Sequence, residues 1–419
     1  MSTVVVVGSG VSALMAAVAI ARRIPRVRVV RLDTGEIDVV DDAIGAARPS
    51  IRAFHAEVGI DEAEIVARTG SGYRAGIQVS GWTGAGYFRG HGGYGNAVGG
   101  VAFHLLWIRA QRCGDVAPFE SFAGSESGLQ LNLSKYSQAL RALGRVAGVE
   151  EIHGAFPVVE THADASEIRT LRLSDGRELN AELYVDATGR GATVRRQLPY
   201  RWIDWRGALP VDRLLIRGQA SDDQLIALPA GWRYHGVSGV ASAHRSDTPD
   251  GSTIAFEQGR LQNAWHGNCV AIGSAAVTLE PTAATNLHAV CRHIERLIAC
   301  WPGGECRATP AEIAYFNRRT ALESDCMRDF VQLPYLLNDR TESFWREAAA
   351  GPVSPELQRT LASFRERGRL PTRDEDGFAR DEWIATLIGQ GVLPRRTDAL
   401  ADEIPLEVIR RVMGANHES

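Results

Sequence analysis

Residues 4–13, VVVVGSGVSA, set the fold class of this chain. The four valines form a continuous β-branched run, as buried parallel strands do, and an apolar helix follows through Ile20. Gly8 permits the tight turn between them, Gly10 lets a diphosphate approach the backbone, and Ala13 lets the helix pack closely on the strand. The pattern G-x-G-x-x-A in this context predicts a dinucleotide site, where the helix N-terminus meets the phosphate charge.

A second strand carries the acid that such a site requires. Val27 to Leu32 is expected to form a neighbouring strand that ends in Asp33, about 20 residues past the glycines, where a carboxylate accepts hydrogen bonds from a ribose. A glycine-rich turn by itself is often structural. The strand before it, the helix after it and the acid at this distance together favour a bound cofactor.

Two later segments favour FAD over NAD as that cofactor. Leu183 to Gly189, LYVDATG, has the form of a strand ending in D-x-T-G beside the cofactor, which assigns Asp186 and Gly189 to the site. Cys269 to Ala276 resembles the strand and glycine turn at the ribityl and phosphate region of a flavin, with Gly273 in the turn. A single nucleotide fingerprint occurs, so we expect no separate NAD(P)H domain.

The composition argues against several classes of protein. The 419 residues are 45% hydrophobic, enough for a large core, and the net charge of -4 and pI near 6.3 argue against nucleic-acid binding. The six cysteines include no C-x-x-C pair and the histidines show no metal-ligand spacing, so we expect reduced thiols and no metal site. No charged-then-apolar leader precedes the first strand, and no apolar run approaches the roughly 20 residues of a membrane span. These features predict a cytoplasmic enzyme.

Residues 268–288, NCVAIGSAAVTLEPTAATNLH, carry a family resemblance. They resemble a run in the flavin-dependent tryptophan halogenases, N-C-V-A-x-G-x-A-x-x-F-x-E-P-L-E-S-T-G. That family is a branch of the flavin monooxygenase fold, and further resembling segments follow in the right order over nearly the whole chain. They are Pro49–His55, Val58–Ile60, Phe103–Arg109, Leu131–Leu133, Tyr136, Leu140–Arg141, Leu209–Arg213, Tyr315–Arg318, Arg328–Phe330, Phe344–Trp345 and Gly389–Gly391.

The resemblance implies an α/β fold of the GR2 type of flavin monooxygenases. A Rossmann-like FAD-binding lobe would be interlocked with a β-sheet substrate lobe and followed by a C-terminal helical region. The FAD-binding lobe is expected to be discontinuous. The expected boundaries are 1–45, 135–200 and 255–300 for the FAD-binding lobe, 46–134 and 201–254 for the substrate lobe, and 301–419 for the helical region.

The sequence departs from the family where halogenation happens. The family's lysine, which accepts or positions hypohalous acid, falls at Arg74, and arginine cannot be that nucleophile at neutral pH. The motif W-x-W-x-I-P, which keeps the substrate away from the flavin, reads Trp232–Val237, so only its first aromatic is unchanged. The family's charge-stabilising Glu and the Ser after it are Ala283 and Ala284. Four changes in one pocket favour a different reaction.

The leading hypothesis is an FAD-dependent monooxygenase that hydroxylates an aromatic ring, a tryptophan or indole, through a flavin C4a-hydroperoxide. The resemblance places Arg74 opposite the flavin, where it would hydrogen-bond the substrate or the peroxide. It places the catalytic candidate Thr285, which would hold the flavin's carbonyl end or the peroxide, at a helix N-terminus beside the flavin ring, together with the cofactor-binding candidates Pro281 and Asn286. His235 is the candidate base that removes the ring proton.

Trp232 and Tyr234, at alternate positions of a strand, are candidates for stacking on the aromatic substrate. Structural alternatives stay open for most of these residues. They are packing for the two aromatic rings, an ion pair for Arg74, an ordinary structural role for His235, and shaping of the loop for Pro281.

The chain is short for the family and lacks the halogenase residues. In both respects it resembles the halogenase-like monooxygenases that hydroxylate a tryptophan in the small subunit of quinohemoprotein amine dehydrogenase, during tryptophylquinone biogenesis. A tryptophan-containing small protein subunit is therefore an expected partner. Reduced FAD would come from NAD(P)H directly or from a flavin reductase, with O2 as co-substrate. Two rivals are a divergent flavin-dependent halogenase and a catalytically silent peptide-binding relative.

Overall fold

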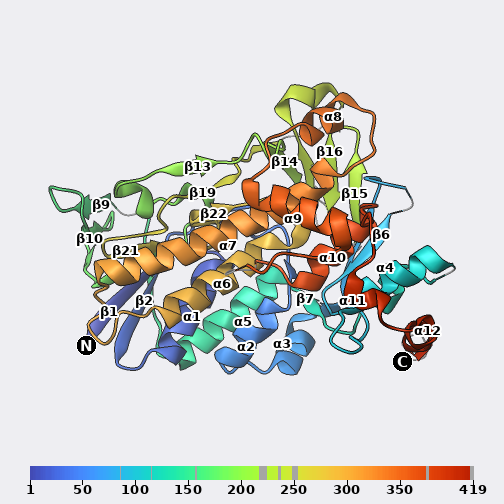
Figure 1. Cartoon of the computed structure of the whole chain (residues 1–419). Coiled ribbons are helices and arrows are strands. Elements are labelled where there is room, and N and C mark those ends of the chain that lie inside the picture. Colours follow the sequence, from blue (N-terminus) through green and yellow to red (C-terminus); the bar gives the residue numbers. More distant parts are fainter. Residues whose placement is uncertain are drawn as a thin grey trace. The chain divides into compact units, whose positions relative to one another are not determined.

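The structure is a computed structural model that describes residues 1–84, 86–114, 116–155, 158–216, 224–234, 237–247, 253–373 and 377–415. The chain forms two compact units, each assembled from three segments, and the fold is mixed α/β (Figure 1). The first unit contains residues 1–73, 128–205 and 257–325, and the second contains 74–127, 206–256 and 326–419.

A six-stranded sheet forms the centre of the first unit, in the order β20-β21-β12-β1-β2-β8. Neighbouring strands from β21 to β8 pair in parallel, and β20 runs antiparallel at one edge. In β1, Val4 and Val6 join one hydrophobic cluster and Val5 and Val7 join another, so both faces of the strand are covered. This explains the unbroken valine run. The bounds are β1 Ser2–Val7, β2 Val27–Asp33, β8 Glu150–His153, β12 Leu183–Asp186, β20 Trp265–His266 and β21 Cys269–Ala271.

Helices pack on one face of this sheet, and a small antiparallel sheet packs on the other. α1 lies beside both α5 and α6 (Figure 1), and its residues 11–20 are all buried. α1 ends just before Pro25, because proline disfavours helical backbone in the residue before it. The helices are α1 Val11–Arg23, α2 Ser50–Glu57, α3 Glu62–Thr69, α5 Leu133–Val146, α6 Thr285–Ala299 and the first part of α7 Pro310–Leu336.

Three small sheets and several single turns complete the first unit. The strands are β9 Val158–Thr161, β10 Ile168–Arg172 and β11 Glu178–Leu179; β13 Trp202–Asp204, β19 Gly259–Leu261 and β22 Val277–Thr278; and β3 Ala46–Ala47, β7 Gly128–Gln130 and β4 Gly72–Arg74. The 3-10 turns are η2 Gly189–Gly191, η3 Arg195–Gln197, η5 Gly273–Ala275 and η6 Pro281–Ala283. η2 and η5 follow directly on β12 and β21, at the ends where these parallel strands finish.

A seven-stranded sheet forms the centre of the second unit, in the order β18-β14-β17-β16-β15-β5-β6. Its strands pair antiparallel except for β15 with β5. The strands are β5 Gly76–Ser80, β6 Tyr87–Gly90, β14 Arg213–Ile216, β15 Gln224–Leu228, β16 Gly231–Tyr234, β17 Val237–Val240 and β18 Ile254–Ala255. The helices and turns are α4 Phe103–Cys113, η1 Phe119–Phe122, η4 Ser242–Asp247, α8 Ser343–Ala349, α9 Pro355–Arg367, α10 Arg380–Gly389, α11 Ala399–Asp402 and α12 Leu406–Ala415. Among the described helices, none is both long and apolar enough to cross a bilayer.

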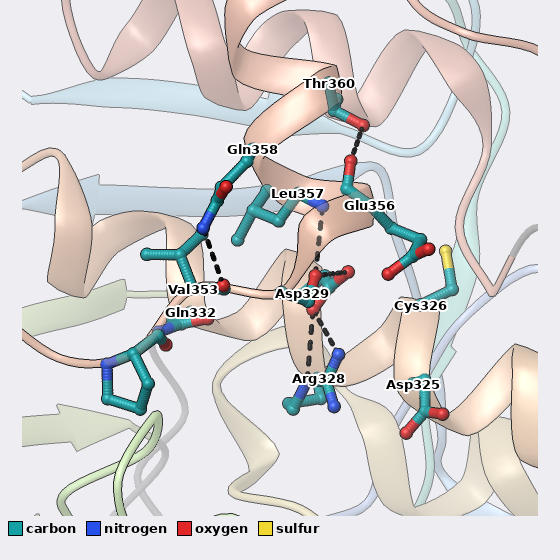
Figure 2. A network of polar contacts seen from close by, with 12 residues as sticks. Asp325, Cys326, Arg328, Asp329, Gln332, Val353, Glu356, Leu357, Gln358 and Thr360 are labelled. Carbon is teal, nitrogen blue, oxygen red and sulfur yellow. Dashed lines mark hydrogen bonds and ion pairs between the residues drawn. The ribbon is translucent and has the colours of Figure 1, made fainter.

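A buried carboxylate in the C-terminal half of α7 contacts the start of α9 (Figure 2). Asp329 accepts hydrogen bonds from Arg328 Nη2 at 2.6 Å and from Ser354 Oγ at 2.8 Å. Ser354 Oγ in turn accepts from the N–H of Leu357 at 3.0 Å and so caps α9. The Arg-Asp-Phe segment at 328–330 therefore has a structural role in the second unit.

Candidate functional site

The turn after β1 is built where only the smallest residues fit. Gly8 has φ +148°, and a Cβ there would lie 2.4 Å from the carbonyl oxygen of Ala187 and 3.0 Å from the Cβ of Ala13. Ala13 itself is fully buried. A larger residue at either position would therefore push β1 away from α1 or β12.

The same turn opens the N-terminus of α1. Gly10 is the N-cap, with φ -79° and ψ 179°, and it supplies no capping side chain. The first N–H groups of a helix lack partners within the helix and carry positive partial charge. Together with the close approach that Gly8 and Gly10 permit, this geometry fits the diphosphate of a dinucleotide.

Asp33 ends β2 beside this turn and is held by two arginines. Arg31 Nη2 lies 2.8 Å and Arg141 Nη2 3.1 Å from its Oδ2. Burial acts to raise the pKa of Asp33, but hydrogen bonds and the Arg31 charge outweigh it and lower the pKa to about 2. Among the described residues, Asp33 also groups with Glu151 and His153 as potential metal ligands, although Arg31 already bridges both carboxylates.

Asp186 shapes the loop that follows β12. Its fully buried carboxylate accepts hydrogen bonds from Thr188 Oγ1 at 2.6 Å, the Val194 N–H at 3.0 Å and the Arg195 N–H at 2.7 Å. Burial raises the pKa of Asp186, and these hydrogen bonds oppose the rise. The Asp186 carboxylate thus stabilises its own loop. In that loop Gly189 has φ +79°, and a Cβ there would lie 2.6 Å from the Cβ of Asp38.

The glycine turn after β21 is hydrogen-bonded to a neutral histidine. Gly273 has φ +58°, and its N–H donates to His293 Nδ1 at 3.0 Å. Burial lowers the pKa of His293 to about 4, so the ring accepts this bond uncharged near neutral pH.

A strained turn precedes α6. Pro281 starts η6, and Ala284, the N-cap of α6, has φ +53°, a conformation that residues other than glycine rarely adopt. The buried Arg48 donates from Nη1 to the Ala283 carbonyl at 3.2 Å and ties this turn to the segment before α2. Like α1, α6 begins without a capping side chain.

The first two residues of α6, Thr285 and Asn286, make different contacts. Thr285 Oγ1 is buried and donates to the Glu280 carbonyl at 2.9 Å, which is a local structural contact. Asn286 Nδ2 lies 3.5 Å from Asp41 Oδ1, in a segment that follows β2.

Most of the predicted cofactor residues lie at one edge of one sheet. β1, β2, β12 and β21 are mutually parallel, and Gly8, Gly10, Asp33, Asp186, Gly189 and Gly273 lie at or just after the carboxyl ends of these strands. In open α/β sheets that edge is where ligands bind. Ala13 lies in α1, whereas Pro281 and Asn286 follow β22 of a different sheet.

The second unit brings together two of the predicted reaction residues. Arg74 is 3% exposed, and its Cζ lies 5.9 Å from the centre of the Tyr234 ring, which is fully buried. A guanidinium at this distance from an aromatic face is attracted to it. The sequence contains a single lysine, Lys135, which is exposed on α5 of the first unit.

Trp232 is a packing residue of the second sheet. Its ring is fully buried against Gly239 on β17, where a Cβ would lie 2.4 Å from the indole. His235, the predicted base, lies outside the described residues.

The sequence analysis assigned no role at the site to Arg31, Arg48, Arg141 or His293. The pairing of Arg31 with Asp33 could have been predicted, because residues i and i+2 of a strand share a face. The other three come from distant segments, and their role depends on the tertiary fold.

The sequence matches the family described as tryptophan halogenase over residues 3–126, 120–235 and 240–406. Tryptophan 7-halogenase RebH from Lentzea aerocolonigenes is 25% identical over 253 residues, covering 52% of this chain and 47% of RebH. This chain spans about half the length of the curated tryptophan halogenases that it matches.

Two solved structures match the whole chain. BrvH, a flavin-dependent halogenase from Brevundimonas sp. BAL3, is 27% identical with a TM-score of 0.88, covering 100% of this chain and 95% of BrvH. Xcc4156, a flavin-dependent halogenase from Xanthomonas campestris, is 26% identical with a TM-score of 0.89, covering 100% of this chain and 94% of Xcc4156.

Proposed function

This chain belongs to the tryptophan halogenase family, and from that premise we propose that it is an FAD-dependent enzyme that oxidises an aromatic, indole-like substrate by halogen transfer. The observation that carries the proposal is the arrangement of three glycine turns and the N-terminus of α1 at the carboxyl edge of the first sheet. That arrangement fits FAD, and the flavin-dependent halogenases are similar to this chain over its whole length.

The residues of the first unit have separate roles in holding FAD. Gly8 and Gly10 let the diphosphate reach the N-terminus of α1, and Asp33 accepts from a ribose. Gly273 and the uncapped start of α6 serve the flavin end. Bound reduced FAD supplies, with oxygen, the oxidising power of the reaction.

Arg74 has an electrostatic role in this proposal. A guanidinium stays charged at every physiological pH and offers planar donors, so it binds an anion without acting as a nucleophile. Its burial beside Tyr234 lowers the local dielectric and strengthens that attraction. We assign Arg74 the binding of a halide or of an anionic group on the substrate.

Two partners follow from the same proposal. A separate flavin reductase would supply reduced FAD, and the aromatic substrate would be a free indole or an indole within a peptide.

Hydroxylation of the ring is the second candidate reaction. A specific observation favours it: the chain has no lysine other than Lys135, and Arg74 stands at the position that resembles the halogenase lysine. In this case oxygen would reach the ring without passing through a halide, and a tryptophan in a small protein subunit would be one substrate to examine.

Product masses separate these candidates. The FAD-loaded protein would be mixed with a flavin reductase, NADH, oxygen and a panel of indoles, with and without bromide. Halogen transfer predicts a bromine isotope pattern that appears with bromide and vanishes without it. A gain of oxygen that ignores bromide supports hydroxylation instead, and unchanged indoles in both conditions contradict both reactions for those substrates.

A further inference from the structure

A pocket of about 350 Å³ opens in the second unit, beside β6, the strand at the end of the seven-stranded sheet. Small-molecule sites have volumes of about 300–1,000 Å³. The walls of this pocket come from β6, α4, η1 and α10 and from the segments next to them. None of these segments carries a residue assigned to FAD binding, so the pocket is separate from the cofactor edge of the first unit.

Four aromatic rings line this pocket, those of Tyr87, Phe88, Trp107 and Phe119. The Trp107 and Phe119 rings meet edge to face with their centroids 5.3 Å apart, and Trp107 Nε1 donates to the Ala117 carbonyl at 3.0 Å. Tyr87, Trp107 and Phe119 are each at most 5% exposed. Packing therefore holds these three rings in place, and a ligand that contacts them pays little to order them.

Tyr87 packs directly on the backbone at the end of α10. A Cβ on Gly389 would lie 2.3 Å from the Tyr87 ring, so no larger residue fits there. Gln390 Nε2 donates to the Tyr87 hydroxyl at 3.2 Å. The glycine–glutamine pair that begins segment 389–391 thus fixes one wall of the pocket.

Glu120 gives the pocket its charge. Its Oε2 accepts a hydrogen bond from the N–H of Phe88 at 3.0 Å, which fixes the carboxylate at the side of β6. Among the described residues that line the pocket, Glu120 is the one charged side chain. Both arginines of α4, Arg109 and Arg112, donate instead to backbone carbonyls of the C-terminal region. A carboxylate among aromatic rings attracts a positively charged ligand.

We propose that this pocket binds an arylalkylammonium ion, with the ammonium group at Glu120 and the aromatic body against the four rings. The site is independent of FAD and of the proposed reaction. An ammonium ion is attracted both by a carboxylate and by the faces of aromatic rings. A neutral ligand of the same shape keeps the apolar contacts alone, and an anion is repelled by Glu120. The charge of the ligand should therefore decide its affinity.

Isothermal titration calorimetry with three probes of similar shape tests the site on the wild-type protein. The probes are phenylethylammonium, the neutral phenylethanol and the anionic phenylpropionate. We expect the ammonium ion to bind about tenfold more tightly than the alcohol, the anion to bind more weakly than both, and the difference to shrink in high salt. Equal affinity for the ammonium ion and the alcohol, or no binding of the ammonium ion up to about 10 mM, overturns the proposal.

Glu120→Gln gives a second test on the protein side. The carboxamide oxygen can still accept from the Phe88 N–H, so the variant loses the charge and keeps the hydrogen bond. We expect its affinity for phenylethylammonium to fall about tenfold and its affinity for phenylethanol to stay within about twofold. Glu126→Gln is the matched control, because Glu126 is an exposed acid in the loop after η1, outside the pocket, and should bind both probes as the wild type does.

Wild-type affinity of Glu120→Gln for phenylethylammonium overturns the proposal, as does an equal loss in Glu126→Gln. Circular dichroism establishes that each variant is folded. If Glu120→Gln does not fold, the comparison of the three probes on the wild-type protein still decides the outcome.

Discussion

The turn after β1 and the Arg74–Tyr234 pair depend on different kinds of chemistry. The turn works through backbone geometry: Gly8 meets the Ala187 carbonyl so closely that no side chain fits. The pair in the second unit works through side-chain charge, because a buried guanidinium lies near an aromatic ring. Backbone crowding fixes a residue type, whereas a side-chain contact can be exchanged without disturbing the fold. The glycine turn therefore indicates its ligand more specifically than the Arg74–Tyr234 pair indicates a reaction.

The largest effect is expected at the turn. Gly8→Ala places a methyl group 2.4 Å from a backbone oxygen, which we expect to cost about 3 kcal/mol of unfolding free energy and to weaken FAD binding more than about 100-fold. Thermal unfolding and FAD titration measure both quantities. Gly304→Ala is the control, since no atom lies within 4 Å of its added Cβ. Normal FAD affinity in Gly8→Ala would show that the turn holds no phosphate.

Substitution of Arg74 should lower product formation and leave FAD affinity nearly unchanged. Arg74→Ala is expected to lower product formation by about 100-fold, as loss of a buried charge at a reaction site does, while FAD affinity stays within about twofold. The exposed Arg233, between Trp232 and Tyr234 on β16, provides the control Arg233→Ala, which should keep full activity. Equal losses in both variants would remove the special role of Arg74.

Acid should weaken the cradle through His293. The pKa of this buried ring in the folded state is about 4, below its ordinary 6.5. The contribution of the neutral His293 ring to the free energy of unfolding is therefore complete above pH 6.5 and is lost as the pH falls to 4, which amounts to about 3 kcal/mol. Urea unfolding between pH 7 and pH 4 should show a smaller loss in His293→Gln than in the wild type. The exposed His153→Gln should follow the wild type, and a wild-type slope in His293→Gln would contradict the assignment.

The smallest effect is expected at the strained turn before α6. Ala284→Gly relieves a φ of +53°, and we expect a gain of about 0.5 kcal/mol in unfolding free energy after the added chain entropy of glycine. Ala283→Gly, at a neighbour without positive φ, should instead lose about 0.5 kcal/mol. A loss at both positions would mean that the turn stores no strain.

Much of the first unit could be predicted from local patterns. The valine run, the glycines and the acid after β2 predict a parallel sheet with a dinucleotide edge, because each feature reports its own backbone environment. Asp186 was also assigned to this edge, although its carboxylate accepts hydrogen bonds from the backbone N–H groups of Thr188, Val194 and Arg195. A strand-ending acid does not reveal from sequence whether it faces a ligand or its own loop.

The reaction residues were harder to predict for a physical reason. Trp232 and Tyr234 alternate along β16, which is compatible with stacking on a substrate, yet Trp232 is packed over Gly239 of the next strand. The contacts of Asp38 and Asp41 were missed because their partners, Arg190, Ser274 and Asn286, lie more than 100 residues away in the sequence. Tertiary contacts of this kind leave no local signature.

A single-turnover experiment measures halogen transfer by the bound flavin. The protein would be loaded with FAD, reduced chemically without oxygen, and then mixed with oxygen, bromide and an indole, with product counted per flavin by mass spectrometry. Halogen transfer by this protein predicts close to one brominated indole for each reduced flavin. Complete reoxidation of the bound flavin with hydrogen peroxide as the sole product, across the indole panel, would contradict it.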